Sequence, residues 1–135
     1  MNILDRSLDL SYGMFDPDEN KTTHHFSFLF KRNKLIAWGK NYMAEESAKA
    51  LKIAKIFNIH HFREYPYIHS EIDLLSKVLG RVNINKKIMV NTRLSTEGIR
   101  NSRPCENCDT VLQNFNIRLY HTTRRGFRCL RYGVE

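Results

Sequence analysis

The apolar residues of this chain fall into runs of two kinds, which predict different elements. Five runs are rich in β-branched and aromatic residues and indicate strands. They cover residues 25–30, 35–39, 87–94, 117–121 and 127–132. Three other stretches predict helices, two of them from apolar residues at helical spacing among good helix formers. They cover residues 43–57, 69–79 and 104–114.

The lengths of two connections decide how the strands pair. Lys31-Arg32-Asn33-Lys34 joins the first two strands and predicts a hairpin. Only residues 122–126 separate the last two strands, which is enough for an antiparallel hairpin but leaves no room for a crossover helix. We therefore expect an α/β domain whose mixed sheet of about five strands ends in an antiparallel hairpin and is covered by helices.

Length and composition predict one domain. The chain has 135 residues, 41% of them hydrophobic, which suffices for a buried core and argues against disorder. No repeat, low-complexity tract or linker divides it. We expect a single domain over residues 1–135, with a core in residues 24–132. Residues 1–22 are polar and turn-rich and predict an N-terminal extension with a short helix near its start.

The cysteine count and the apolar runs bear on the compartment. Three cysteines without a secretory leader do not make a disulfide framework. No apolar run approaches the length of a membrane span. We expect a soluble, cytoplasmic protein without a membrane partner.

The charge of the chain is strongly positive, with a formal net charge of +8 and a pI near 9.6. This balance favours an anionic partner such as a nucleotide, RNA or DNA, although an ordinary basic surface gives the same total. The arginines are concentrated in two segments. They are Arg93, Arg100 and Arg103 in one segment and Arg118, Arg124, Arg125, Arg128 and Arg131 in the other.

Two short motifs carry the candidate chemistry. His69-Ser70-Glu71 opens one predicted helix, and Pro104-Cys105-Glu106-Asn107-Cys108 opens another. A hydrolytic zinc site keeps three protein ligands and leaves one position for water, which a set of His69, Cys105 and Cys108 would satisfy. The two cysteines are three residues apart and share one face of a helix. We predict that two helix N-termini converge on one zinc ion, Zn²⁺.

Glu71 has a different predicted role. Residues two apart on a helix point in different directions, so Glu71 is poorly placed to be a ligand beside His69. Zinc lowers the pKa of the water that it binds, and a nearby carboxylate can take the proton and pass it to a leaving nitrogen. This apparatus suits water attack on an amidine-like carbon with loss of ammonia.

Two alternatives use fewer of these residues. A structural zinc site would need a fourth ligand such as Cys129, which instead reads as an inward-facing strand residue. A redox Cys-x-x-Cys pair would need a thioredoxin-like order of elements and would leave His69 and Glu71 without a use. The pairs His24-His25 and His60-His61 are expected to be ordinary surface residues.

Together the two motifs, supported by Gly39-Lys40-Asn41, resemble the cytidine deaminase-like superfamily of zinc-dependent deaminases over residues 24–132. The resemblance implies a three-layer α/β/α fold. It also implies zinc ligation by His69, Cys105 and Cys108, a proton shuttle at Glu71 and a contact of Asn41 with the sugar or base of the substrate. Self-association into a homo-oligomer is implied as well.

The chain departs from each branch of that superfamily. Free-cytidine deaminases generally have cysteine in place of His69. The nucleic-acid-editing and tRNA branches usually place a helix between the last two strands. The deoxycytidylate branch shares the His-x-Glu form but commonly has a longer chain. A compact, divergent member is the reading that fits.

These observations predict a hydrolytic deaminase that converts cytosine to uracil in a nucleotide or in single-stranded DNA or RNA. We expect Arg103, Tyr120 and His121 to contact the substrate, and residues 58–68 to form one wall of its pocket. The alternatives are a deaminase of adenine, guanine or pterin and a non-catalytic, zinc-stabilised module that binds nucleic acid.

Overall fold

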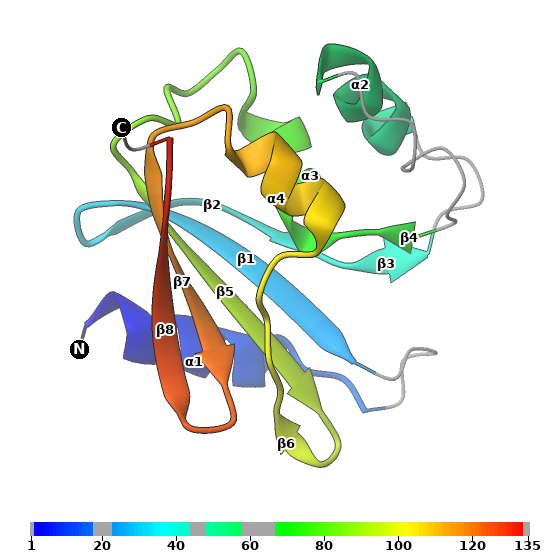
Figure 1. Cartoon of the computed structure of the whole chain (residues 1–135). Helices are drawn as coiled ribbons and strands as arrows, with labels where there is room; N and C mark the ends of the chain where they lie inside the picture. Colours follow the sequence, from blue (N-terminus) through cyan, green and yellow to red (C-terminus); the bar gives the residue numbers. More distant parts are fainter. Residues whose placement is uncertain (1, 18–22, 44–47, 58–66, 134–135) are drawn as a thin grey trace.

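The structure, a computed structural model, describes residues 2–17, 23–43, 48–57 and 67–133 (Figure 1). Its helices are α1 (Ile3–Met14), α2 (Ala48–Phe57), α3 (Ser70–Val78) and α4 (Glu106–Leu112). Its longer strands are β1 (His24–Lys31), β2 (Lys34–Lys40), β5 (Ile88–Ser95), β7 (Ile117–Thr123) and β8 (Gly126–Tyr132). Three two-residue strands are β3 (Tyr42–Met43), β4 (Tyr67–Ile68) and β6 (Gly98–Ile99).

The long strands form one mixed sheet in the order β2-β1-β5-β7-β8. Neighbours are antiparallel except β5 and β7, which run parallel with helix α4 between them in the chain. The predicted strands and the closing antiparallel hairpin are confirmed. The two-residue strands were not predicted, because segments so short leave no periodic pattern.

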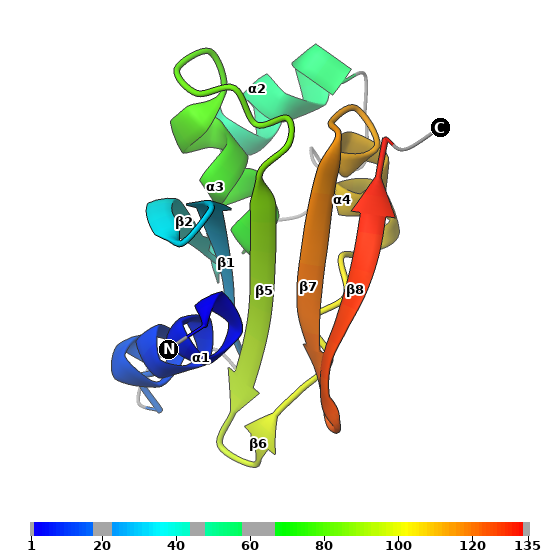
Figure 2. The same ribbon diagram turned by 90° about the vertical axis from the view of Figure 1, so that its left-hand side faces the viewer.

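Helices cover both faces of the sheet, which makes the fold a three-layer α/β/α arrangement. Strand β1 shows how the two faces differ. Phe26, Phe28 and Phe30 pack with side chains of α1, whereas Leu29 joins the core formed by α2, α3 and α4. Figure 2 shows α1 and α4 on opposite sides of the strands. In the described part of the chain, no helix has the length and apolar character required to cross a membrane.

The N-terminal segment forms a longer helix than we predicted, and this helix packs on the sheet. Residues 3–14 form a twelve-residue helix that covers one face of the sheet. Its buried stripe includes the small polar residues Ser7 and Ser11, and the Ser11 hydroxyl is 2.6 Å from that of Thr92 on β5. The stripe is easily missed in the sequence because serine is not counted as apolar.

Helix bounds differ from the predictions at three starts. Residue 43 belongs to β3, which pairs with β4, so α2 is described from Ala48 onward. His69 and Cys105 are N-cap residues that precede α3 and α4, rather than residues within the first turn. The backbone at an N-cap is extended, so the helix begins one residue later. The spacing of apolar residues in the sequence does not reveal this difference.

Gly39 lets α3 lie directly on β2. A Cβ atom at this position would stand 2.5 Å from both the Ser70 carbonyl oxygen and the Leu74 main-chain nitrogen. Next to it, the Lys40 N–H donates to the buried Asp73 carboxylate at 3.1 Å, which ties β2 to the same helix. The start of α3 is therefore positioned by a close backbone contact that only glycine permits.

We predict that Gly39→Ala destabilises the fold by about 1–3 kcal/mol, the usual cost of overpacking a well-filled core. Gly13→Ala is the matched control, because a Cβ at Gly13 in α1 meets nothing within 4 Å. It should leave stability unchanged or raise it by up to about 1 kcal/mol through helix propensity. Urea unfolding of both variants measures this, and equal stabilities would contradict the role given to Gly39.

Candidate metal centre

Two helix starts converge at the centre of the α3–α4 side of the sheet. His69 is the N-cap of α3, and Cys105 is the N-cap of α4. The Cys105 Sγ accepts a hydrogen bond from the Cys108 main-chain N–H at 3.4 Å, so the cysteine caps its own helix. Cys108, one turn further on, is fully buried. The structure thus brings the two predicted motifs together.

The spacing of the three ligand atoms suits a tetrahedral metal site. The His69 Nδ1 lies 3.4 Å from the Cys105 Sγ and 3.5 Å from the Cys108 Sγ. Zinc bonds of about 2.3 Å to sulfur and 2.0–2.1 Å to nitrogen at tetrahedral angles place such atoms about 3.5 Å apart. All three ligand atoms lie within 4.8 Å of one another. These residues are close enough to hold a metal ion.

The protonation of the two thiols also suits a cation. The pKa of Cys105 is lowered to about 4, chiefly by the hydrogen bond with the Cys108 thiol, against burial and with help from His69. The pKa of Cys108 is raised by the same hydrogen bond, then by burial and the charge of Glu71. The two sulfurs thus share one proton, and both become thiolates when a divalent cation replaces it.

His69 completes the charge balance. Its pKa is raised, first by the hydrogen bond with Cys105, against burial, and then by the negative charges of Cys105 and Glu71. A histidine must be neutral to act as a ligand, so a raised pKa makes metal binding by this ring more sensitive to low pH.

Glu71 lies beside the three ligands but outside their set. Its side chain is 1% exposed. The Ser70 hydroxyl donates to its Oε1 at 2.9 Å, whereas its Oε2 is buried and has no hydrogen-bond partner among the described residues. A buried carboxylate oxygen without a partner is unfavourable, so this atom is suited to a ligand or water in the site.

A row of close polar contacts connects Glu71 to the centre of the sheet. The hydroxyls of Ser70 and Ser27 are 2.8 Å apart, and Ser27 on β1 donates to the Asn91 Oδ1 on β5 at 2.7 Å. Asn91 and the segment before α4 are joined in turn, since the Ser102 hydroxyl donates to the Asn91 carbonyl oxygen at 2.8 Å. These contacts attach the start of α3 to β1 and the segment before α4 to β5, and Ser27 and Asn91 connect the two strands.

The other predicted site residues fall on different sides of the sheet. His121 is buried on the α3–α4 side, where Arg103 and Arg128 lie close enough to lower its pKa in addition to burial, the larger cause. Tyr120 packs with Phe28 and Val90 on the α1 side instead. Adjacent strand residues point to opposite faces of a sheet. Tyr120 and His121 therefore cannot both contact one substrate on the α3–α4 side, as we had predicted.

Asn41 fixes the chain near the site. Its Oδ1 accepts from the His25 main-chain N–H at 2.9 Å, and its Nδ2 donates to the Thr23 carbonyl oxygen at 3.2 Å. Both bonds go to the beginning of β1. The predicted pocket wall at 58–68 lies mostly outside the described residues; of it, the structure describes only β4.

His25 is a site residue that the sequence analysis assigned to the surface. It lies on the same face of β1 as Ser27, and its Nε2 is buried without a hydrogen-bond partner in the described part of the chain. Burial lowers the pKa of His25, and the nearby charge of Glu71 opposes this. The signal was available: with a strand period of two, His25 shares the face of Ser27 and Leu29.

Cys129 is not the inward-facing residue that we predicted. It is exposed on β8, opposite Tyr120 on β7. The alternation of β8 places Leu130 and Tyr132 in the core and leaves Cys129 on the other face, away from the three ligands. It therefore does not complete a four-ligand structural set.

Fold and site together define an α/β protein with a mixed sheet and a His-Cys-Cys cluster that can hold a metal ion. In comparisons with known proteins, no family model matches this chain, and no curated protein sequence matches it. Its function must therefore be inferred from the site itself.

We predict that the purified protein holds about one equivalent of metal per chain and that Cys108→Ser loses it, because a three-ligand site cannot spare a thiolate. Cys129→Ser is the matched control and should keep the metal. Elemental analysis after dialysis against a weak chelator measures both. His69→Ala, at a partly exposed position, tests the same ligand set if Cys108→Ser does not fold. Full metal content in both ligand variants would disprove the assignment.

Proposed function

We propose that this protein is a zinc-dependent hydrolytic deaminase of the cytidine deaminase-like superfamily. Its proposed reaction converts cytosine to uracil in a nucleotide or in single-stranded nucleic acid. The observation that carries the proposal is the buried Glu71 Oε2 near a three-ligand cluster, because this oxygen has no hydrogen-bond partner among the described residues. A structural metal site has no use for such a carboxylate, whereas hydrolysis requires one.

The proposed chemistry exchanges an amino group for oxygen at one ring carbon. Water forms a bond to C4 of cytosine, the bond from C4 to the amino nitrogen breaks, and the products are uracil and ammonia. Zinc would contribute by lowering the pKa of water in the site. Glu71 takes the proton from the attacking water and delivers it to the departing nitrogen. The Ser70 hydroxyl holds Oε1, which leaves Oε2 directed to the reaction.

The ligand count supports an open, catalytic type of site. Within the described residues the cluster has three members, and Cys129, the candidate fourth ligand, lies exposed on the other face of the sheet. Three protein ligands with one open position are typical of hydrolytic zinc, whereas structural zinc takes four.

Two polar side chains are suited to hold the base in the proposed site. The buried Nε2 of His25 is available to a polar atom of the ring. Asn41 sets the position of the main chain at His25 and matches the superfamily residue that contacts sugar or base. Arg103, two residues before the ligand Cys105, and the neighbouring His121 are proposed to contact the sugar-phosphate part.

The decisive test uses Glu71→Gln, which keeps the shape of the side chain and removes its ability to carry a proton. We expect metal content and fold to persist while turnover falls by about 10²–10⁴-fold, the usual contribution of a general acid–base group. Ammonia release is measured on dCMP, cytidine and a cytosine-rich single-stranded oligonucleotide. Unchanged turnover in Glu71→Gln would refute the role of Glu71.

The same assay separates the alternatives. Release of ammonia from adenosine, guanine or pterin substrates, but from no cytosine compound, would replace cytosine in the proposal. If the zinc-loaded protein releases ammonia from none of these compounds, the result would favour the non-catalytic, zinc-stabilised module.

We further predict that His25→Phe lowers kcat/KM about tenfold, the equivalent of one lost hydrogen bond. Metal content should not change, because His25 lies outside the ligand set. Trp38→Phe, at a position that packs on the α1 side, is the control for an aromatic change in the neighbouring strand. An unchanged kcat/KM in His25→Phe would remove His25 from the substrate pocket.

A further inference from the structure

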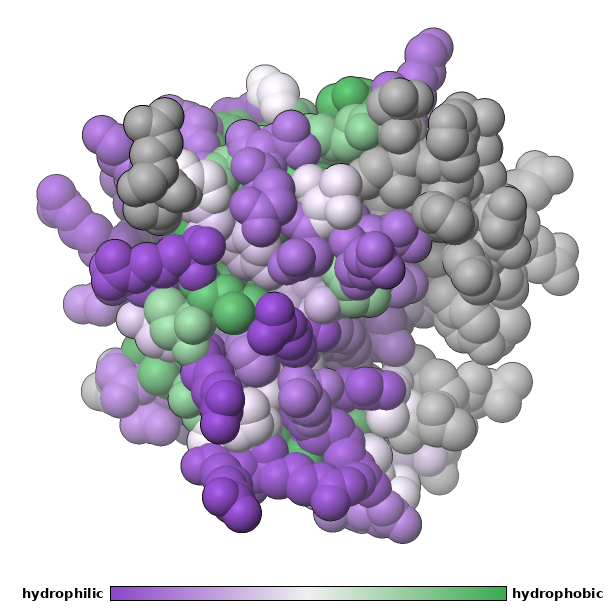
Figure 3. All heavy atoms as spheres, viewed as in Figure 1, coloured by the Kyte–Doolittle hydropathy of each residue, from purple (hydrophilic) through white to green (hydrophobic). Residues whose placement is uncertain are grey.

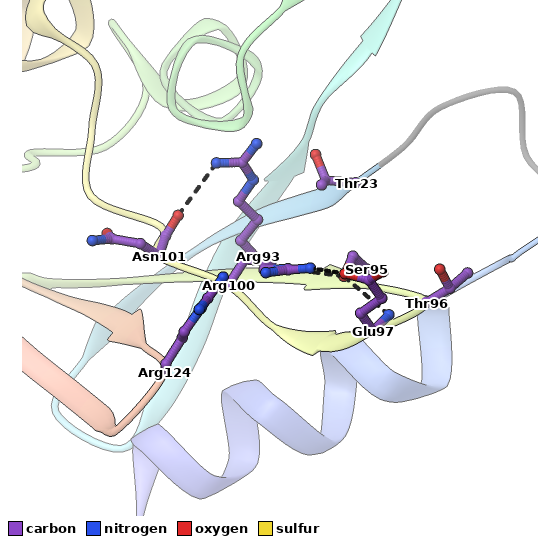
Figure 4. A pocket seen from close by; sticks show the side chains of 8 residues that line it. All are labelled: Thr23, Arg93, Ser95, Thr96, Glu97, Arg100, Asn101 and Arg124. Carbon is purple, nitrogen blue, oxygen red and sulfur yellow. Dashed lines mark hydrogen bonds and ion pairs between the residues drawn. The ribbon is translucent and has the colours of Figure 1, made fainter.

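Two adjoining hollows lie at the end of the sheet where β6 and the β7–β8 hairpin meet. The first has a volume of about 510 Å³ and takes Arg93 from β5, Arg100 from the segment after β6 and Arg124 from the β7–β8 turn (Figure 4). The second has a volume of about 460 Å³ and contains Arg103, Arg125 and Arg128. Asn101 and Arg124 line both hollows, so the two are adjacent.

The charged side chains that line these hollows are almost all positive. Together they contain six arginines and a single carboxylate, Glu97. Glu97 is paired with Arg100, and the Arg93 guanidinium donates to the Asn101 carbonyl oxygen. In the described part of the chain, the remaining five arginines have no carboxylate partner. Arginines gathered without counter-charge repel one another, and an anion with several oxygens would offset that repulsion.

The chain segment that separates the hollows is firmly attached to the sheet. Arg100 N–H donates to the Arg93 carbonyl oxygen at 2.8 Å, and Ser102 N–H donates to the Thr122 carbonyl oxygen at 3.0 Å. The Thr122 N–H in turn donates to the Ser102 hydroxyl at 2.7 Å. Residues 100–103 thus bridge β5 and β7, and two residues after Arg103 the same segment supplies the ligand Cys105.

The arginines also border the candidate metal centre. Arg93 is the cross-strand partner of His25, and its charge contributes to lowering the pKa of that ring after the larger effect of burial. On the other side, Arg103 and Arg128 flank His121. In Figure 3 the hydrophilic colour covers the lower surface, where β6 and the β7–β8 hairpin lie in Figure 1. The hollows therefore lie next to His25 and His121, on the face of the sheet that carries the candidate metal centre.

We propose that Arg93, Arg103, Arg124, Arg125 and Arg128 form a phosphate track that holds the backbone of single-stranded nucleic acid while one base enters the metal centre. This inference rests on the proposed function and narrows its substrate to a polymer. A free nucleotide presents one phosphate group, which one or two arginines neutralise. Five arginines that have no carboxylate partner among the described residues line two adjacent hollows, and such a row matches successive phosphates of a strand.

The arginines of the last hairpin supply a matched pair of variants. Arg124→Glu/Arg128→Glu alters the phosphate track. Arg118→Glu/Arg131→Glu makes the same change of net charge on the same hairpin, at exposed cross-strand partners that face the α1 side. If the two double variants bind nucleic acid differently, the difference is due to the phosphate track and not to the net positive charge of the protein.

The experiment measures binding by fluorescence anisotropy, with a labelled cytosine-containing single strand of 15 nucleotides and zinc-loaded protein. Five phosphate contacts on a single strand predict a log–log salt slope of about 3.5, which is a fall in affinity of about 130-fold between 50 and 200 mM salt. Arg124→Glu/Arg128→Glu should reduce the log–log salt slope by about 1.4, from two lost contacts. Arg118→Glu/Arg131→Glu should keep the slope of the unaltered protein.

Several outcomes would overturn the track. Equal slopes in the two double variants would mean that the basic surface as a whole attracts the strand. Equal affinity for a duplex of the same length would remove the preference for single strands. Turnover of dCMP without oligonucleotide binding would reduce the arginines to a site for one phosphate and leave the proposed deaminase intact. Tight, salt-dependent binding without ammonia release would instead uphold the track and refute the deaminase.

Discussion

The contact of α3 with strands β1 and β2 is the constraint on which the candidate metal centre depends. This contact depends on a close approach of two backbones and on a pair of hydroxyl groups. Gly39 removes a side chain so that β2 and α3 meet backbone to backbone, and the Ser27–Ser70 hydroxyl pair fixes the helix against β1. Because His69 and Glu71 flank Ser70, both their positions follow from where that one serine is held. A shift of α3 by even a fraction of an ångström would alter the spacing between the ligand atoms.

One group of buried polar residues lies near the site, and its members are hydrogen-bonded to one another. Ser27, Ser70, Asn91, Ser102 and Thr122 are all buried, and each is hydrogen-bonded to at least one of the others. Buried polar groups are costly unless they are paired, so a connected set of this kind fixes one arrangement of strands and helices. Next to this set, the His25 Nε2 and the Glu71 Oε2 have no hydrogen-bond partner among the described residues, and a ligand would complete the set there.

Electrostatics divides the neighbourhood of the site into two zones. Two thiols and the Glu71 carboxyl lie together at the candidate metal centre, where a divalent cation would offset their negative charge. Arginines from β5, residues 100–103 and the β7–β8 hairpin line the two hollows, where Glu97 is the one carboxylate among the described lining residues. The hollows would attract an anion, whereas the centre would attract a cation.

The sequence by itself determined the strands, the closing hairpin and the residue types of the candidate site, because period, turn length and ligand chemistry are local properties. The tertiary structure decided which residues meet. It placed Tyr120 on the far face, moved Cys129 to the surface and brought His25 to Glu71, since each of these depends on which side of a strand faces which helix. It also turned the first residues of the chain into a covering helix, because a stripe that contains Ser7 and Ser11 is recognised as buried only against the strand it packs on.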